Sequence, residues 1–507
     1  MPNPPKTPAP IRYRIDMPEP HTHLYRVTLT IAEPEGMQRL SLPAWIPGSY
    51  LIREFARHLQ GLRARQGRRA LPVVQTGKSS WEVACKPGTA LTLDYAVYAG
   101  DASVRTAWLD ASRGFFNATS LCLRAQGHTH HPHTLELTAP RTRPRWQVAT
   151  GLAAARVDAH GFGLYAAADY DELADCPFEL GAFWSGHFKA AGVPHRFVVA
   201  GATAAFDGER LLADTKTICE TAIRFWHGRG KPPHKSYVFM LNAVDDSYGG
   251  LEHRNSTALI CGRRDLPRLG EPKASDGYTT LLGLISHEYF HTWNVKRLRP
   301  AEFTRYDYTQ ENYTRLLWFF EGFTSYYDDL LLRRAGLLDD AGYLKLLNKT
   351  INQVLQTPGR AVQSVAQASF DAWVKYYRPD ENTPNATVSY YTKGALVALC
   401  LDLSLRREGH TTLDAVMRAL WTRCQAGPMR EDDLLAVLAD LGGRDFSPEL
   451  ADWVRGTGEL PLKDLLEHHG VAVHEDAAQP AQRLGLRVTE TAGIQVKVVL
   501  RASAAER

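Results

Sequence analysis

The most informative segment of the sequence is His287-Glu288-Tyr289-Phe290-His291. Residues four positions apart lie about one turn apart on the same face of a helix, so His287 and His291 can both present an imidazole to one cation. Zinc suits neutral imidazole, and a catalytic zinc keeps three protein ligands and one open position. Glu288 projects beside the pair, where it can take a proton from an activated water. The stretch therefore predicts a helix that carries a zinc site.

A third zinc ligand is expected from another helix. Glu321 lies within Trp318-Phe319-Phe320-Glu321-Gly322-Phe323, in a predicted helix over Glu311–Arg334 that follows the zinc helix. An unpaired carboxylate among aromatic rings costs several kcal/mol of desolvation unless a cation compensates it. The structural alternatives are a salt bridge to Arg315 and, for the two histidines, a surface pair bonded to solvent. Taken together, the residues favour His287, His291 and Glu321 as the metal ligands.

The order of elements predicts an α+β chain of several domains. Alternation of apolar and polar residues, as over Tyr25–Ile31 and Leu91–Val97, predicts an antiparallel β domain over residues 1–172. Strands and helices mix after residue 172, and a helical period dominates residues 276–470. The expected domains are a catalytic domain over residues 173–335 and a helical domain over residues 336–473. A polar linker over His474–Gln482 then precedes two expected strands, Leu484–Val488 and Ile494–Leu500.

Composition excludes several classes of protein. The chain has 507 residues, of which 44% are hydrophobic and 22% charged, as is usual for a globular protein. With 59 basic and 55 acidic residues the formal net charge is +4, and the even mixture argues against nucleic-acid binding. No apolar run is long enough to span a membrane. Seven scattered cysteines and an N-terminus without an apolar signal segment favour a reducing, cytoplasmic location.

Several motifs carry a family resemblance. Three motifs resemble those of the gluzincin aminopeptidases: His287–His291, Glu321-Gly322-Phe323 and Gly249-Gly250-Leu251-Glu252-His253. Their sequences are most similar to those of the M61 glycyl aminopeptidase family. Glu321 follows His291 by 30 positions, a longer spacing than in the larger M1 relatives and one that M61 shows. Further stretches that resemble M61 are Trp45–Tyr50, Arg113–Asn117, His291–Pro300 and Val388–Gly394.

The resemblance implies roles for further residues and a thermolysin-like catalytic domain. Glu252 matches the acid that holds the free α-ammonium of the substrate, and Gly249 and Gly250 would let a peptide backbone approach closely. Tyr391 matches the phenol that donates to the developing oxyanion. His253 stands where the M1 motif has Asn, which leaves the hydrogen bonding around Glu252 open. A salt bridge within a loop is the structural alternative for Glu252, and an ordinary core or surface aromatic is the alternative for Tyr391.

The expected function is that of a zinc-dependent aminopeptidase, a hydrolase with one zinc per chain. It would remove Gly or Ala from peptides with a free N-terminus, a preference that only the resemblance implies. The alternatives are a zinc endopeptidase or other zinc hydrolase on the same site, and an inactive peptide-binding homologue. The segment 484–507 resembles the opening of the PDZ domain of many M61 chains, but it is too short for a complete one. The oligomeric state is not predicted.

Overall fold

The computed structural model describes residues 10–476, 480–490 and 493–507. Residues 1–9 of the expected β domain, 477–479 of the expected linker and 491–492 of the tail lie outside the described residues. The described chain divides into two compact units. The first comprises residues up to 217, 231–288 and 307–311, and the second comprises residues 218–230, 289–306 and 312–507.

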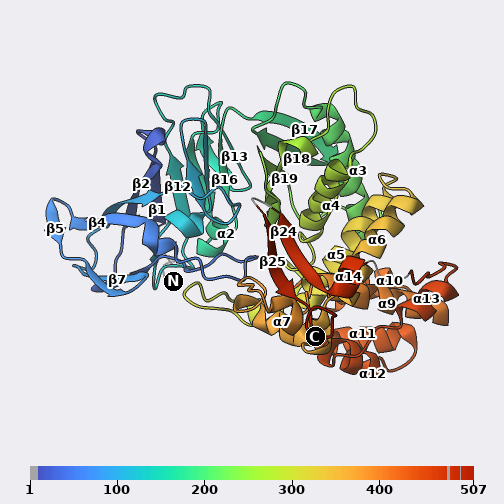
Figure 1. Cartoon of the computed structure of the whole chain (residues 1–507). Coiled ribbons are helices and arrows are strands. Elements are labelled where there is room, and N and C mark those ends of the chain that lie inside the picture. Colours follow the sequence, from blue (N-terminus) through green and yellow to red (C-terminus); the bar gives the residue numbers. More distant parts are fainter. Residues whose placement is uncertain (1–9, 477–479, 491–492) are drawn as a thin grey trace, which may run out of the picture. The chain divides into compact units, whose positions relative to one another are not determined.

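The first unit begins with β sheets, as the alternating sequence predicts (Figure 1). The predicted strand over Tyr25–Ile31 is β2, with burial that alternates along its length. In the largest sheet the pairing is antiparallel except that β1 runs parallel to β12. The largest sheet has the order β14 (Ala153–Val157), β15 (Gly163–Ala167), β12 (His133–Leu137), β1 (Ile11–Asp16), β2 (Leu24–Ile31), β8 (Leu91–Tyr98), β4 (Leu59–Gln66) and β5 (Arg69–Leu71).

Two smaller sheets and two short helices complete the β region. Their elements are β13 (Gln147–Thr150), β16 (Phe178–Gly181), β10 (Arg113–Phe116) and β9 (Ala107–Leu109) in one sheet, β11 (Arg124–Ala125), β3 (Met37–Ser41), β7 (Ser80–Ala84) and β6 (Val74–Gly77) in the other, and the helices α1 (Ala118–Leu121) and α2 (Tyr170–Ala174).

A mixed sheet with two long helices follows. Its order is β17 (Trp184–Ala190), β18 (Val193–Ala200), β19 (Tyr237–Val244), β21 (Ser256–Gly262) and β20 (Gly249–Glu252), so β20 is an edge strand. The helices are α3 (Gly208–His227) and α4 (Asp276–Phe290). Strands β18, β19 and β21 are parallel, and β19 and β21 are buried almost throughout, as is typical of parallel strands with both faces covered. The predicted zinc helix is α4, and His291 lies in the turn directly after it.

The second unit is mainly helical, as predicted for the C-terminal region. Its helices are α5 (Leu317–Arg334), α6 (Asp340–Leu355), α7 (Val365–Phe370), α8 (Thr383–Ala386), α9 (Thr392–Glu408), α10 (Leu413–Arg423), α11 (Glu431–Gly442), α12 (Ser447–Leu450), α13 (Leu462–His468) and α14 (Pro480–Leu484). Its short strands are β22 (Arg299–Pro300), β23 (Pro428–Met429), β24 (Leu486–Glu490) and β25 (Ile494–Val499). Helix α5 packs against α9, α7 and α6.

Two predicted boundaries are wrong. Helix α5 begins at Leu317 rather than at Glu311, because distant side chains bond the backbone there. The Asn312 carbonyl, before the helix, accepts from Trp373 Nε1 at 3.2 Å, and the Trp318 amide, in the first turn of the helix, donates to Ser369 Oγ at 2.9 Å. The first strand of the tail begins at Leu486, since residues 480–484 form α14. Strands β24 and β25 form an antiparallel hairpin. The PDZ resemblance and the finer domain boundaries stay predictions.

No helix of the described residues is both long enough and apolar enough to cross a lipid bilayer.

Candidate metal centre and active site

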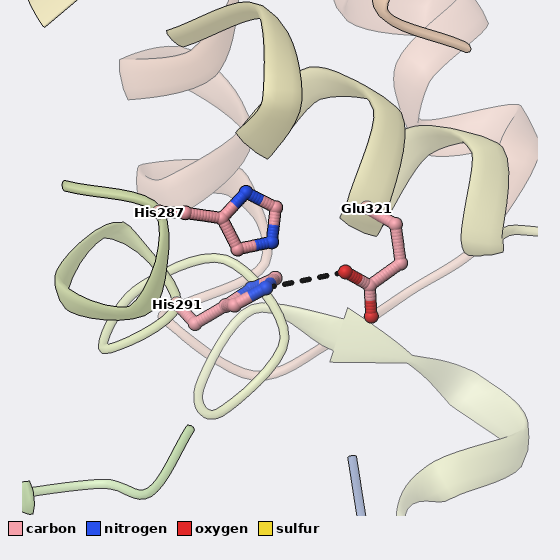
Figure 2. Close-up of side chains that lie close together, drawn as sticks. All are labelled: His287, His291 and Glu321. Carbon is pink, nitrogen blue, oxygen red and sulfur yellow. Dashed lines mark ion pairs between the residues drawn. The ribbon is translucent and has the colours of Figure 1, made fainter. Parts of the chain in front are cut away.

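Helices α4 and α5 and the turn after α4 bring the three predicted metal ligands together. One ligand atom from each of His287, His291 and Glu321 lies within 4.8 Å of the others. Figure 2 shows the three side chains pointing toward one another, with an ion pair of 3.2 Å between His291 Nε2 and Glu321 Oε2. His291 and Glu321 are 1% and 2% exposed, so solvent cannot compensate their polar atoms. Two imidazoles and one carboxylate form the donor set of a catalytic zinc site, and the residues fit that ion.

Asn294 orients one of the imidazoles. The Nδ1 atom of His291 lies 2.8 Å from the Asn294 carbonyl oxygen, to which it donates, and Nε2 is thereby left to face Glu321. The Asn294 side chain donates to the Phe320 carbonyl at 3.1 Å and to Thr324 Oγ1 at 3.2 Å, on the helix that carries Glu321. Asn294 lies in the stretch His291–Pro300 that resembles M61, but no role was predicted for it; that stretch and its closeness to His291 in the chain were the available signals.

The Arg315 alternative for Glu321 does not occur. The Arg315 guanidinium carbon lies 4.8 Å from the centre of the Phe370 ring, and Glu321 pairs with His291 instead. Glu321 is thus a buried carboxylate in contact with an imidazole. A metal cation bound beside a buried carboxylate compensates its charge and thereby stabilises the folded protein.

Glu252, on edge strand β20, belongs to a second cluster of buried groups. Ligand atoms of Glu252, Glu288 and His291 also lie within 4.8 Å of one another. Glu252 is 4% exposed, and its Oε1 atom is buried without a hydrogen-bond partner. The loop salt bridge considered for Glu252 is therefore absent from the described residues. The neighbouring His253 places Nδ1 3.4 Å from Asp175 Oδ1.

Two glycines allow close packing around these acids. A Cβ atom on Gly250 would overlap the Glu288 carboxylate, so only glycine lets β20 lie against that side chain. Gly48 has φ +92°, and a Cβ there would lie 2.6 and 2.7 Å from the two carboxylate oxygens of Glu252. Gly48 belongs to the stretch Trp45–Tyr50, in which Trp45 Nε1 donates to the Asp307 carbonyl at 2.7 Å. Sequence reasoning found this stretch but gave Gly48 no role.

Tyr391 lies at the start of α9 and next to Glu321. Burial raises the pKa of Tyr391 well above its ordinary value, and the negative charge of Glu321 raises it further. The phenol is therefore protonated at neutral pH and can donate a hydrogen bond. The Tyr391 hydroxyl lies 3.1 Å from the Tyr377 hydroxyl. Sequence reasoning did not single out Tyr377.

Two glycines at the point where α5 and α9 cross set the position of Tyr391 relative to Glu321. A Cβ atom on Gly322 would lie 2.6 Å from Gly394 Cα, and a Cβ on Gly394 would lie 2.5 Å from the Trp318 carbonyl oxygen. Because neither residue has a side chain, α5 and α9 approach backbone to backbone. Glu321 directly precedes one glycine and Tyr391 lies three positions before the other.

Comparison with known proteins identifies the family of the chain. Family models match the chain for the Peptidase M61 N-terminal domain over residues 12–182 and for M61 glycyl aminopeptidase over residues 280–397. The aminopeptidase N family protein from Idiomarina loihiensis is 41% identical, with a TM-score of 0.94 over 98% of this chain and 87% of that one. A comparison with curated proteins gives no match.

More distant structures share the fold. The M1 zinc metallopeptidase from Deinococcus radiodurans is 16% identical, with a TM-score of 0.55 over 90% of this chain and 95% of that one. A mutant of that enzyme bound to a Tyr-Ser-Ala substrate has a TM-score of 0.54 at 15% identity, over 90% of this chain and 95% of that one. Together, the family matches and the fold define a metallopeptidase. The chain belongs to the M61 glycyl aminopeptidase family.

Proposed function

We propose that this chain is a zinc-dependent aminopeptidase that releases small N-terminal residues, Gly or Ala, from peptides with a free N-terminus. One zinc ion per chain would be held by His287, His291 and Glu321. When bound, it would polarise the scissile carbonyl and lower the pKa of a water molecule. Family membership supports the peptidase activity, and the donor set of two imidazoles and one carboxylate supports zinc.

The residues of the chain would then perform three tasks. Glu288 would take the proton of the attacking water and deliver it to the leaving amine, a role worth about 10²- to 10⁴-fold in rate. Tyr391 would donate a hydrogen bond to the oxyanion of the tetrahedral intermediate. Gly249 and Gly250 would let the substrate backbone lie close to β20.

The aminopeptidase assignment depends on the burial and the hydrogen bonding of Glu252. Its carboxylate is buried, and its Oε1 atom has no hydrogen-bond partner among the described residues. A buried anion with an unmet acceptor is costly unless a cation occupies the site. The α-ammonium group of a peptide is such a cation, and binding it there would fix the first residue beside Glu288.

The test compares glycine p-nitroanilide with its N-acetylated form. The wild-type protein should hydrolyse the free-amine substrate at least ~100-fold faster, since charge-assisted hydrogen bonds are strong. Glu252→Ala and the isosteric Glu252→Gln should lose most of this discrimination. Equal loss on both substrates would favour an endopeptidase or another zinc hydrolase.

Metal analysis tests the cofactor separately. The purified protein should hold one zinc ion per chain, and a chelator should abolish hydrolysis until zinc is restored. His291→Ala should lose the metal, whereas Glu288→Gln should retain it and still be inactive. Active protein without zinc would contradict the proposal, and zinc-bound wild-type protein without turnover on peptides would favour the inactive homologue.

A further inference from the structure

Strand β20 has one open edge. It lies at the end of its sheet, and its only partner strand in the described part of the chain is β21. The Leu251 carbonyl accepts from Thr257 Oγ1 of β21 at 3.0 Å, so it points toward β21. Carbonyl groups of successive residues in a strand point to opposite sides, and the Gly250 carbonyl therefore points to the open edge.

Arg105 lies at this open edge. Its Nη2 atom donates to the Gly250 carbonyl at 3.1 Å, and its Nη1 atom lies 3.5 Å from the position of a Cβ on Gly249. Its Nε atom is buried and has no hydrogen-bond acceptor, and no Asp or Glu of the described residues forms an ion pair with it. Arg105 is thus a half-buried cation, and not all of its N–H groups have a hydrogen-bond acceptor.

The distance along β20 fits a short peptide. A strand advances about 3.3 Å per residue, so Gly250 lies roughly 7 Å and Gly249 roughly 10 Å along the strand from Glu252. An extended dipeptide or tripeptide spans about the same length from its amine to its carboxylate. A short peptide laid along the open edge with its amine at Glu252 would therefore bring its C-terminal carboxylate to Arg105.

We propose that Arg105 binds the C-terminal carboxylate of di- and tripeptide substrates and gives the enzyme a preference for short peptides. The inference rests on the proposed function, because it needs the substrate amine at Glu252. A planar guanidinium is the side chain best suited to a carboxylate, since two of its N–H groups can donate in parallel. Incomplete solvation of Arg105 strengthens its attraction for an anion.

The experiment compares peptide acids with peptide amides. Release of glycine from Gly-Gly-Gly and from its C-terminal amide is measured, together with the same pair of hexaglycine peptides. The wild-type kcat/KM should favour the tripeptide acid by about 10- to 100-fold, the range of a charge-assisted hydrogen bond. The hexaglycine acid and amide should react alike, because their C-terminus lies beyond Arg105.

Arg105→Gln should reduce the tripeptide acid-to-amide ratio to about one, mainly through the KM of the acid. Arg105→Met, which keeps the aliphatic stem, replaces it if the Gln variant does not fold. The matched control is Arg196→Gln, since Arg196 also donates to a backbone carbonyl, that of Val148 at 3.0 Å, but lies on β18. This control should keep the wild-type ratio.

Two results would overturn the inference while leaving the aminopeptidase assignment intact. One is a wild-type ratio near one for the tripeptide pair, and the other is an unchanged ratio in the Arg105 variant. A wild-type protein that hydrolyses none of the four peptides would overturn the proposed function and this inference with it.

Discussion

At the scale of single residues, the site depends on a glycine as well as on its reactive groups, because one position must have no side chain. The Glu288 carboxylate occupies the space that a side chain on Gly250 would need. The sequence predicts that Gly250 allows a close approach by the substrate, and the structure adds that it allows a close approach by the proposed general base. A position can be constrained by its own neighbours before any ligand binds.

Gly250→Ala should therefore displace Glu288 and lower kcat by at least ~100-fold, the lower range for loss of a general base. Zinc content should stay at the wild-type level, because neither residue is a proposed ligand. The measurements are steady-state kinetics and metal analysis. The control is Gly36→Ala, where the nearest atom to the new Cβ is 3.8 Å away. A fully active Gly250→Ala protein would contradict the assignment of Glu288 as the base.

Asn294 should matter for metal affinity rather than for chemistry. Its side chain joins the turn that carries the His291 acceptor to α5, and partners of this kind typically change metal affinity by about 10- to 100-fold. Asn294→Ala should weaken zinc binding by that factor in a competition titration with a chromogenic chelator. Asn352→Ala, which removes an exposed amide from α6, should leave the zinc affinity unchanged. An unaltered affinity in Asn294→Ala would show that the turn holds His291 without this side chain.

At the scale of elements, the crossing of α5 and α9 aligns Glu321 with Tyr391. Gly394→Ala would place a methyl group against the Trp318 carbonyl, and overpacking of this kind costs about 1–3 kcal/mol. The melting temperature should fall, and kcat should fall more than KM rises, because the phenol acts only on the transition state. Normal kinetics in a destabilised Gly394→Ala protein would separate the crossing from catalysis.

The helices and strands also show which parts of the fold could be predicted from the sequence and which could not. Alternating burial gives β2 a regular pattern, and its position could be predicted from it. The start of α5 could not, because side chains distant in sequence, such as Ser369, bond the backbone there. The same limit holds for the site. The spacing of His287 and His291 is local and predictable, whereas contacts of Gly48 and Arg105 with β20 depend on the folded chain.

At the scale of the whole molecule, buried histidines link stability to pH. Burial lowers the pKa of His133 to about 4 and that of His195 to about 4. His133 stacks on Tyr13, meets Tyr170 edge-on and donates from Nδ1 to the His131 carbonyl. Among the residues that the structure describes, no acidic side chain forms an ion pair with this imidazole.

The sign of the effect follows from the two pKa values. The imidazole of the unfolded chain binds a proton near pH 6.5, whereas that of the folded chain binds it only near pH 4. The free energy of unfolding is therefore highest above pH 6.5 and decreases as the pH falls toward 4, because only the unfolded chain gains the proton in this range. Each of the two histidines should lower the free energy of unfolding by up to about 3 kcal/mol between pH 6.5 and pH 4. The urea midpoint of the first unfolding transition should therefore be lower at pH 4.5 than at pH 7, and His133→Phe should reduce that difference. Exposed His160→Gln is the control and should leave the difference unchanged. An equal pH dependence in wild-type protein and His133→Phe would mean that other groups govern acid unfolding, and that the buried imidazole contributes nothing to it.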